Sequence, residues 1–168
     1  MSSGCTVGID PGERWIGVAR AARGSSLALP VGTIDRGGKG DREVVDALKE
    51  LLGQEEVSEL VIGVPLRPDG REDEQAASFR QFGEAVADRL GAVCIAQDER
   101  FSSVAPLHVD VPSDAEPKGK SRARGRRSVQ RRRRERERSH ATAAAQILQR
   151  WLDARDSERA RELADSGA

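Results

Sequence analysis

The stretch "TVGIDPGERWIGVAR" at residues 6–20 decides what kind of sheet this chain builds. Its two halves, "TVGID" and "WIGVAR", carry the branched apolar residues that are typical of β-strands. Between them, "PGER" begins with a Pro-Gly pair, which favours a tight turn. The stretch therefore predicts a β-hairpin. Asp10 ends the first strand of this hairpin, directly before the backbone turns.

Further strands and helices follow in alternation. Residues 27–34 predict a third strand at a sheet edge, where Pro30 is tolerated. Residues 42–52 place apolar side chains at helical spacing. The runs "LVIGV" at 60–64 and "AVCIA" at 92–96 are continuous, which is typical of strands buried on both faces. A helix between those two runs is predicted to end at a glycine.

The last helix carries an apolar face within "ATAAAQILQRWLD" at residues 141–153, and its predicted start lies between residues 128 and 139. The order of elements predicts an α/β fold, with a mixed sheet flanked by helices. We expect one domain over residues 1–153, with a basic and mobile insertion at 113–138. Residues 154–168 are expected to form a polar tail that frays.

Charge is distributed unevenly along a chain whose formal net charge is +0. Residues 118–138 hold twelve Lys and Arg against Glu135 and Glu137, so the remainder of the chain is acidic. This asymmetry favours an arm that binds a polyanion such as nucleic acid. The alternative is a solvated loop that has no partner.

Neither a leader peptide nor an apolar run of membrane-spanning length is apparent, so we expect a cytoplasmic protein with no membrane partner. Cys5 and Cys94 both lie in apolar runs, which predicts buried thiols rather than a disulfide or a zinc site.

Two carboxylates stand at predicted strand ends. Asp10 follows the first strand, and Glu99 follows the "AVCIA" strand by a few residues. If these strands are neighbours, the two acids converge, and a hard cation such as Mg²⁺ or Mn²⁺ relieves their repulsion. Such ions activate water for phosphodiester cleavage. The alternatives are that Asp10 bonds to its own turn and that Glu99 pairs with Arg100.

The successive motifs "VGIDPGERWIGVA", "LVIGVPLRPDGREDEQA", "FRQFGEAVADRL", "DERFSS" and "ATAAAQILQRWLD" resemble the RuvX/YqgF family of pre-16S rRNA nucleases. The family is also described as Holliday-junction resolvase-like. The resemblance runs from about residue 6 to residue 153, and it implies a ribonuclease H-like fold and a nuclease that depends on divalent Mg or Mn. It also implies that Asp10 and Glu99 are the first two metal-binding acids.

The family's third acid normally precedes the Ala-rich last helix, and His140 occupies that place. A neutral imidazole binds Mn²⁺ but is a poorer ligand for Mg²⁺. Glu137, three residues earlier on the same helix face, is a candidate replacement for the missing carboxylate. The alternative is that His140 begins a helix without binding metal, in a site that has decayed.

Substrate contacts are predicted at the loops around these acids. Arg14, Arg67 and Arg100 each adjoin a site loop, where a guanidinium holds phosphate bidentately or orients a carboxylate. Ser102 and Ser103 stand where the family usually has threonines, and they keep hydroxyls available for phosphate. The alternative for each arginine is a solvated surface role.

The resemblance implies a metal-dependent nuclease that processes the 5′ end of pre-16S rRNA in ribosome biogenesis. Two alternatives stay open: a non-catalytic nucleic-acid-binding protein with a degenerate site, and a Holliday-junction resolvase that acts on DNA. An actin-like or sugar-kinase ATPase shares the first loop motif, but it needs a longer chain and a second phosphate loop. The sequence does not predict the oligomeric state.

Overall fold

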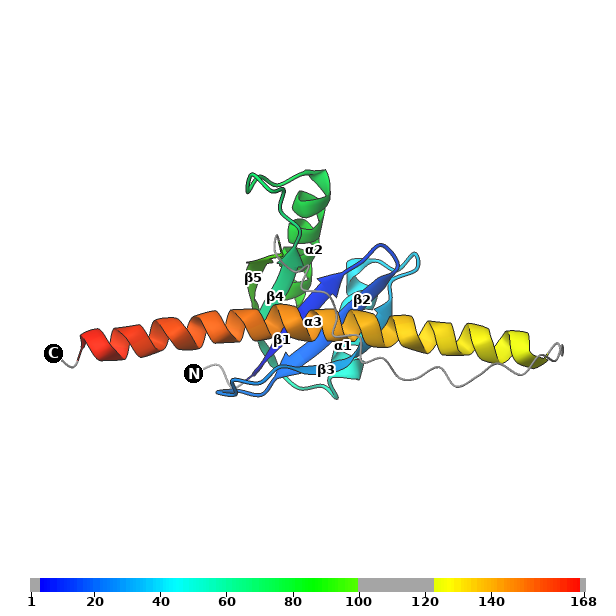
Figure 1. Cartoon of the computed structure of the whole chain (residues 1–168), viewed down its shortest axis with the longest axis horizontal. Helices are drawn as coiled ribbons and strands as arrows, with labels where there is room; N and C mark the ends of the chain where they lie inside the picture. Colours follow the sequence, from blue (N-terminus) through cyan, green and yellow to red (C-terminus); the bar gives the residue numbers. More distant parts are fainter. Residues whose placement is uncertain (1–3, 100–122, 167–168) are drawn as a thin grey trace, which may run out of the picture.

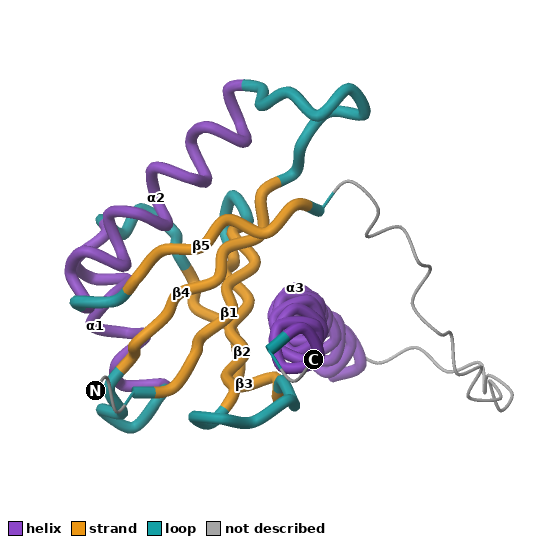
Figure 2. Tube along the Cα trace, turned by 90° about the vertical axis from the view of Figure 1, so that its left-hand side faces the viewer, coloured by secondary structure: helices purple, strands orange, loops and turns teal. Residues whose placement is uncertain are grey.

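The computed structural model describes residues 4–99 and 123–166, and within them a five-stranded sheet lies between helices. Figure 1 shows the sheet crossed by one long helix, and Figure 2 shows helices on both of its faces. The strand order is β3-β2-β1-β4-β5. The strands are β1 (Cys5–Pro11), β2 (Trp15–Ala21), β3 (Leu29–Asp35), β4 (Val57–Val64) and β5 (Val93–Asp98).

The sheet is mixed. β1 pairs antiparallel with β2, and β2 pairs antiparallel with β3, so the predicted hairpin is confirmed. β1, β4 and β5 run parallel, which brings their carboxyl ends to one edge of the sheet. Pro30 lies in β3, an edge strand as predicted. This arrangement confirms the predicted α/β, ribonuclease H-like fold.

Two helices cover one face of the sheet. Helix α1 spans Asp41–Leu51 and α2 spans Glu74–Leu90. The Asp73 carboxylate caps α2 by accepting a 2.9 Å hydrogen bond from the amide of Ala76. The helix ends at Gly91, whose φ of 69° suits a residue without a Cβ. These helices enclose the larger core, which includes Val7, Ile9, Leu48, Leu60, Ile62, Phe82 and Val86.

Helix α3 (Ala123–Asp165) covers the opposite face and projects beyond the sheet at both ends (Figure 1). It packs closely because glycines face it: a Cβ at Gly8 would meet Leu148 at 2.7 Å and the Ala144 carbonyl at 3.0 Å. Its apolar contacts form the second core, which includes Ala19, Ala21, Val61, Ala144, Ile147, Leu148 and Leu152.

Helix α3 begins at Ala123, upstream of its predicted range, and continues through the predicted tail to Asp165. Part of the expected mobile insertion is therefore helical, because the arginine-rich residues before His140 are good helix formers. The remainder of that insertion lies outside the described residues. None of the helices in the described part of the chain is long and apolar enough to cross a bilayer.

Strand β5 is more exposed than predicted. It lies at the end of the sheet, with β4 as its neighbour, and its Val93 side chain is 63% exposed. Cys94 in this strand is consequently half-buried, whereas Cys5 in the inner strand β1 is buried as expected. A continuous apolar run thus indicated a strand correctly but did not show that the strand was an edge.

Candidate active site

Asp10 lies near the end of β1, on the face that α3 covers. The alternation of the strand fixes this orientation, since Val7 and Ile9 point into the other core while Gly8 contacts α3. The Asp10 side chain is 22% exposed, and burial raises its pKa. His140 beside it opposes that rise by favouring the charged carboxylate.

His140 reaches Asp10 because β2 has a glycine at the crossing point. Gly17 lies directly opposite Asp10 in the β1–β2 pairing. A Cβ on Gly17 would overlap the carbonyl oxygen of His140, so α3 touches the sheet backbone there. The imidazole Nδ1 lies 3.6 Å from the Asp10 Oδ2. The histidine that replaces the family's third acid is therefore adjacent to the first acid.

Glu99 follows β5, which is not a neighbour of β1, because β4 lies between them. Glu99 is nevertheless held at the same sheet edge, since its amide donates a 3.1 Å hydrogen bond to the Val64 carbonyl of β4. Its carboxyl group lies over Gly63, where a Cβ would meet it at 2.8 Å. A glycine in the intervening strand thus leaves room for the Glu99 side chain.

Burial and the charge of Asp10 raise the proton affinity of Glu99. Burial, then the charge of Asp10, then that of Asp98 raise the pKa of Glu99 to about 7, although Arg150 opposes the rise. At neutral pH the carboxyl of Glu99 is therefore partly protonated when no cation is present. A bound cation would compensate the negative charge of these carboxylates and would therefore stabilise the site.

The donor chemistry of these residues fits a divalent cation. Two carboxylates supply hard oxygen ligands for Mg²⁺ or Mn²⁺, and an imidazole nitrogen adds a ligand that suits Mn²⁺ better. Within residues 4–99 and 123–166, no three His, Cys, Asp or Glu side chains converge tightly enough to hold an ion together. Water and substrate oxygens commonly complete the coordination of Mg²⁺ and Mn²⁺ where few protein ligands are available.

The predicted substrate contacts are only partly described. Arg14 and Arg67 are exposed in the loops that follow β1 and β4, at the same sheet edge as the acids. Arg100, Ser102 and Ser103 lie outside the described residues, as does the side chain of Glu137.

Sequence reasoning missed three residues at this site. Gly17 leaves room for the backbone of His140, and Gly63 leaves room for the side chain of Glu99. Arg150 of α3 lies close enough to Glu99 to lower its pKa. A signal for the glycines was present, since glycine inside a strand often marks a close approach of another element. No pattern singled out Arg150 among the many arginines of the chain.

Comparison with known proteins shows the family to which the chain belongs. A family model described as "RuvX: Holliday junction resolvase" matches residues 4–154. A protein of Nocardioides sp. named "Putative pre-16S rRNA nuclease" is 40% identical over 62% of this chain and 69% of its own length. A protein of Myxococcus xanthus with the same name is 34% identical over 89% of this chain and 87% of its own. Among solved structures, T. thermophilus RuvC with a Holliday junction substrate aligns at a TM-score of 0.39 and 19% identity, over 57% of this chain and 65% of that one. The family match covers the whole five-stranded sheet and α3 as far as residue 154, so this chain belongs to the RuvX family.

Proposed function

We propose that this protein is a divalent-metal-dependent nuclease that processes the 5′ end of pre-16S rRNA. One observation carries the proposal: Asp10, Glu99 and His140 come from three separate elements and lie at one edge of the sheet. Membership of the RuvX family and the names of the Nocardioides and Myxococcus relatives support it. In this proposal residues 1–153 are the nuclease unit, with 113–138 as its basic insertion and 154–168 as its tail.

Each site residue has a role in this proposal. Asp10 and Glu99 hold Mg²⁺ or Mn²⁺ through their carboxylates, and the bound cation supplies Lewis acidity for activating water. His140 contributes a nitrogen ligand from α3, next to Asp10. Because imidazole brings no negative charge, the site is expected to work better with Mn²⁺ than with Mg²⁺.

RNA is the expected substrate, and structured DNA is the second candidate because the family description names Holliday junctions. The twelve Lys and Arg of residues 118–138 supply positive charge for the phosphate backbone. Arg14 and Arg67 would add phosphate contacts nearer the acids. Binding is therefore expected to weaken steeply as salt increases, since each neutralised phosphate releases counterions.

The test is cleavage of end-labelled RNA that spans the 5′ end of pre-16S rRNA, in Mn²⁺ and in Mg²⁺, beside a four-way DNA junction. The variants are Asp10→Asn, His140→Ala and His140→Asp. Asp46→Asn is the matched control, since Asp46 is an exposed carboxylate on α1, across the sheet. We expect Asp10→Asn to lose about 100-fold or more in rate, as when a charge-stabilising group is removed. RNA affinity and the Asp46→Asn variant should stay close to wild type.

The His140 variants test whether His140 is a metal ligand. If His140 binds metal, His140→Ala loses cleavage and His140→Asp gains activity in Mg²⁺. If the wild-type protein binds RNA but cuts neither RNA nor DNA in either metal, it is a non-catalytic nucleic-acid-binding protein. Cleavage of the DNA junction alone would identify a resolvase.

A further inference from the structure

Trp15 lies close to the proposed active site. It is the first residue of β2, two residues before Gly17, which faces Asp10 across the hairpin. Residues two apart on a strand share a face, so Trp15 lies on the α3 side of the sheet with Asp10. A diagonal neighbour of this kind is about 7–8 Å away between Cα atoms, well within reach of an indole ring.

The position of Trp15 is fixed by backbone bonds on both sides. The turn is closed by the amide of Gly12, which donates a 3.0 Å hydrogen bond to the Trp15 carbonyl. The amide of Arg36 donates a 2.7 Å bond to the Arg14 carbonyl, which ties the turn to the loop after β3. The half-buried ring is therefore presented from a rigid strand end rather than from a mobile loop.

Arg14 lies over this ring, with its guanidinium carbon 5.4 Å from the ring centroid. Its ion pair with Asp35 is long, at 3.7 Å, and its side chain is 70% exposed. Exposed ion pairs of this length contribute little, so Arg14 can exchange that partner for a ligand at small cost. Aromatic rings and guanidinium planes are the groups on which proteins stack unpaired bases.

A second pair in the same chain has the same chemistry but a different setting. Arg155 lies over Trp151 at 5.1 Å, and its guanidinium also bonds the Asp156 carboxylate at 2.9 Å and the Ser25 carbonyl at 3.4 Å. The Arg155 side chain is only 32% exposed. The Arg155 guanidinium is therefore occupied in holding α3, whereas that of Arg14 is exposed, at the same sheet edge as the acids.

We infer that Trp15 and Arg14 form a stacking site for an unpaired base next to the scissile phosphate. The site favours substrates in which the cut lies in a single-stranded segment, because a base held in a duplex cannot stack on a side chain. This inference rests on the proposed nuclease function and specifies the class of substrate that the site accepts.

The first arm of the test uses intrinsic fluorescence, because the chain has two Trp and no Tyr. In Asp10→Asn/Trp151→Phe, Trp15 is the only indole, and cleavage is blocked while the RNA binds. Asp10→Asn/Trp15→Phe is the matched control, with Trp151 as the only indole. Single-stranded RNA spanning the cut should quench Trp15 emission at the same concentrations at which labelled RNA gains anisotropy, and Trp151 emission should not change.

The second arm measures affinity. Trp15→Leu keeps an apolar side chain but removes the aromatic face, and we expect it to weaken RNA binding about 10-fold. Trp15→Phe should restore most of that loss, and an abasic nucleotide beside the cut should remove the difference between Trp15→Leu and wild type. Trp151→Leu should bind like wild type.

The outcomes distinguish failure of the stacking site from failure of the nuclease function. The stacking site is overturned if RNA binds with unchanged Trp15 emission, if both indoles are quenched equally, or if Trp15→Leu binds as tightly as wild type. The fluorescence arm leaves Trp15 intact, so it decides the matter even if Trp15→Leu is unstable. Failure of the nuclease function appears separately, as absence of cleavage by the wild-type protein.

Discussion

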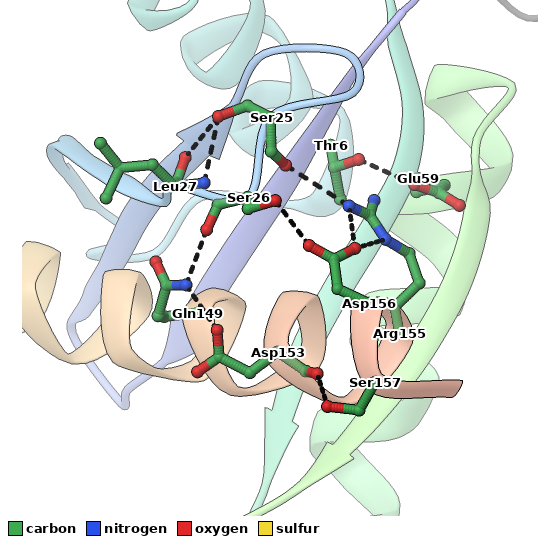
Figure 3. Close-up of polar contacts among 10 residues, drawn as sticks. All are labelled: Thr6, Ser25, Ser26, Leu27, Glu59, Gln149, Asp153, Arg155, Asp156 and Ser157. Carbon is green, nitrogen blue, oxygen red and sulfur yellow. Dashed lines mark hydrogen bonds and ion pairs between the residues drawn. The ribbon is translucent and has the colours of Figure 1, made fainter. Parts of the chain in front are cut away.

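Within the described residues, two regions of polar contact between α3 and the rest of the molecule differ in kind. One is the His140–Asp10 contact at the sheet edge, and the other is a clamp formed by the loop between β2 and β3 (Figure 3). In the clamp, the Gln149 side chain accepts a 2.9 Å bond from the Ala28 amide and donates a 2.8 Å bond to the Ser26 carbonyl. The Ser26 hydroxyl donates a 2.6 Å bond to the Asp156 carboxylate.

The electrostatics of the two regions are opposite. The hydrogen bond from Ser26 and the contact with Arg155 lower the pKa of Asp156, so the clamp stabilises its charge with the chain's own groups. At the site, burial raises the pKa of Asp10 and Glu99, so those charges are poorly compensated. The clamp is thus complete within the protein, whereas the acids gain from a cation that the solvent must supply. The groups that neutralise the carboxylate thus distinguish the clamp from the proposed site.

The largest effect is expected when a side chain is added at Gly17, where α3 crosses β2. Gly17→Ala places a Cβ against the His140 carbonyl, which is backbone and cannot move without shifting α3. We expect the free energy of unfolding in urea to fall by about 1–3 kcal/mol, the usual cost of overpacking. A shift of about 1 Å at His140 should also cost on the order of 100-fold in cleavage rate.

Gly32→Ala is the matched control for this change. Gly32 lies in the neighbouring strand β3, where a Cβ would meet the flexible end of Leu51 at 3.3 Å. It should keep both stability and cleavage near wild type. Equal losses in the two variants would mean that the close crossing at Gly17 has no special importance for the site.

A smaller effect is expected when the clamp is broken at Gln149. Gln149→Met keeps the length of the side chain but removes its bonds to Ala28 and Ser26. The free energy of unfolding should fall by about 1 kcal/mol, and the Ala28 amide should exchange its hydrogen faster. Cleavage should remain close to wild type, as should every property of the control Gln146→Met, which changes an exposed residue of the same helix. A loss of cleavage comparable to that of Gly17→Ala would show that the clamp sets the geometry of the site.

The sequence predicted individual strands, turns and helix ends better than it predicted which strands lie next to one another in the sheet. The hairpin at residues 6–20, the edge strand with Pro30 and the helix that ends at Gly91 were predictable because turn and cap chemistry acts within a few residues. The position of β4 between β1 and β5 was not, since strand order depends on packing between distant segments. For the same reason, the exposure of β5 was missed.

The candidate site shows the same division. The acids Asp10 and Glu99 were predicted from their places at strand ends, and His140 was predicted from the motif around it. The positions of His140 and Glu99 at this sheet edge depend on Gly17 and Gly63, whose role is visible only in the folded structure. The clamp was not predicted either. In the sequence, Gln149 and Asp156 are ordinary polar residues of an exposed helix, and their contacts with the β2–β3 loop are visible only in the structure.

The smallest effects, and the most direct test of the electrostatic contrast, are pH dependences measured without metal. The pKa of Glu99 is raised from an ordinary 4.5 to about 7, so the folded state binds this proton more tightly than the unfolded state does. Wild type therefore loses stability as pH rises through this window. Glu99→Gln has no such proton, so it should be more stable than wild type at pH ~8, on the order of 1 kcal/mol after allowing for solvent screening. The advantage should disappear toward pH ~4.5.

Asp156→Asn should behave in the opposite way. The pKa of Asp156 is lowered, so its charge contributes stability above its ordinary value of 3.8, and that contribution is lost as pH falls. The Asn variant should be slightly less stable than wild type at pH ~8 and equal to it in acid. Urea unfolding in EDTA and low salt across this pH range measures both variants. If Glu99→Gln, like Asp156→Asn, is less stable than wild type at pH ~8, then the protein already compensates the charge of Glu99, and the site gains little from a bound cation.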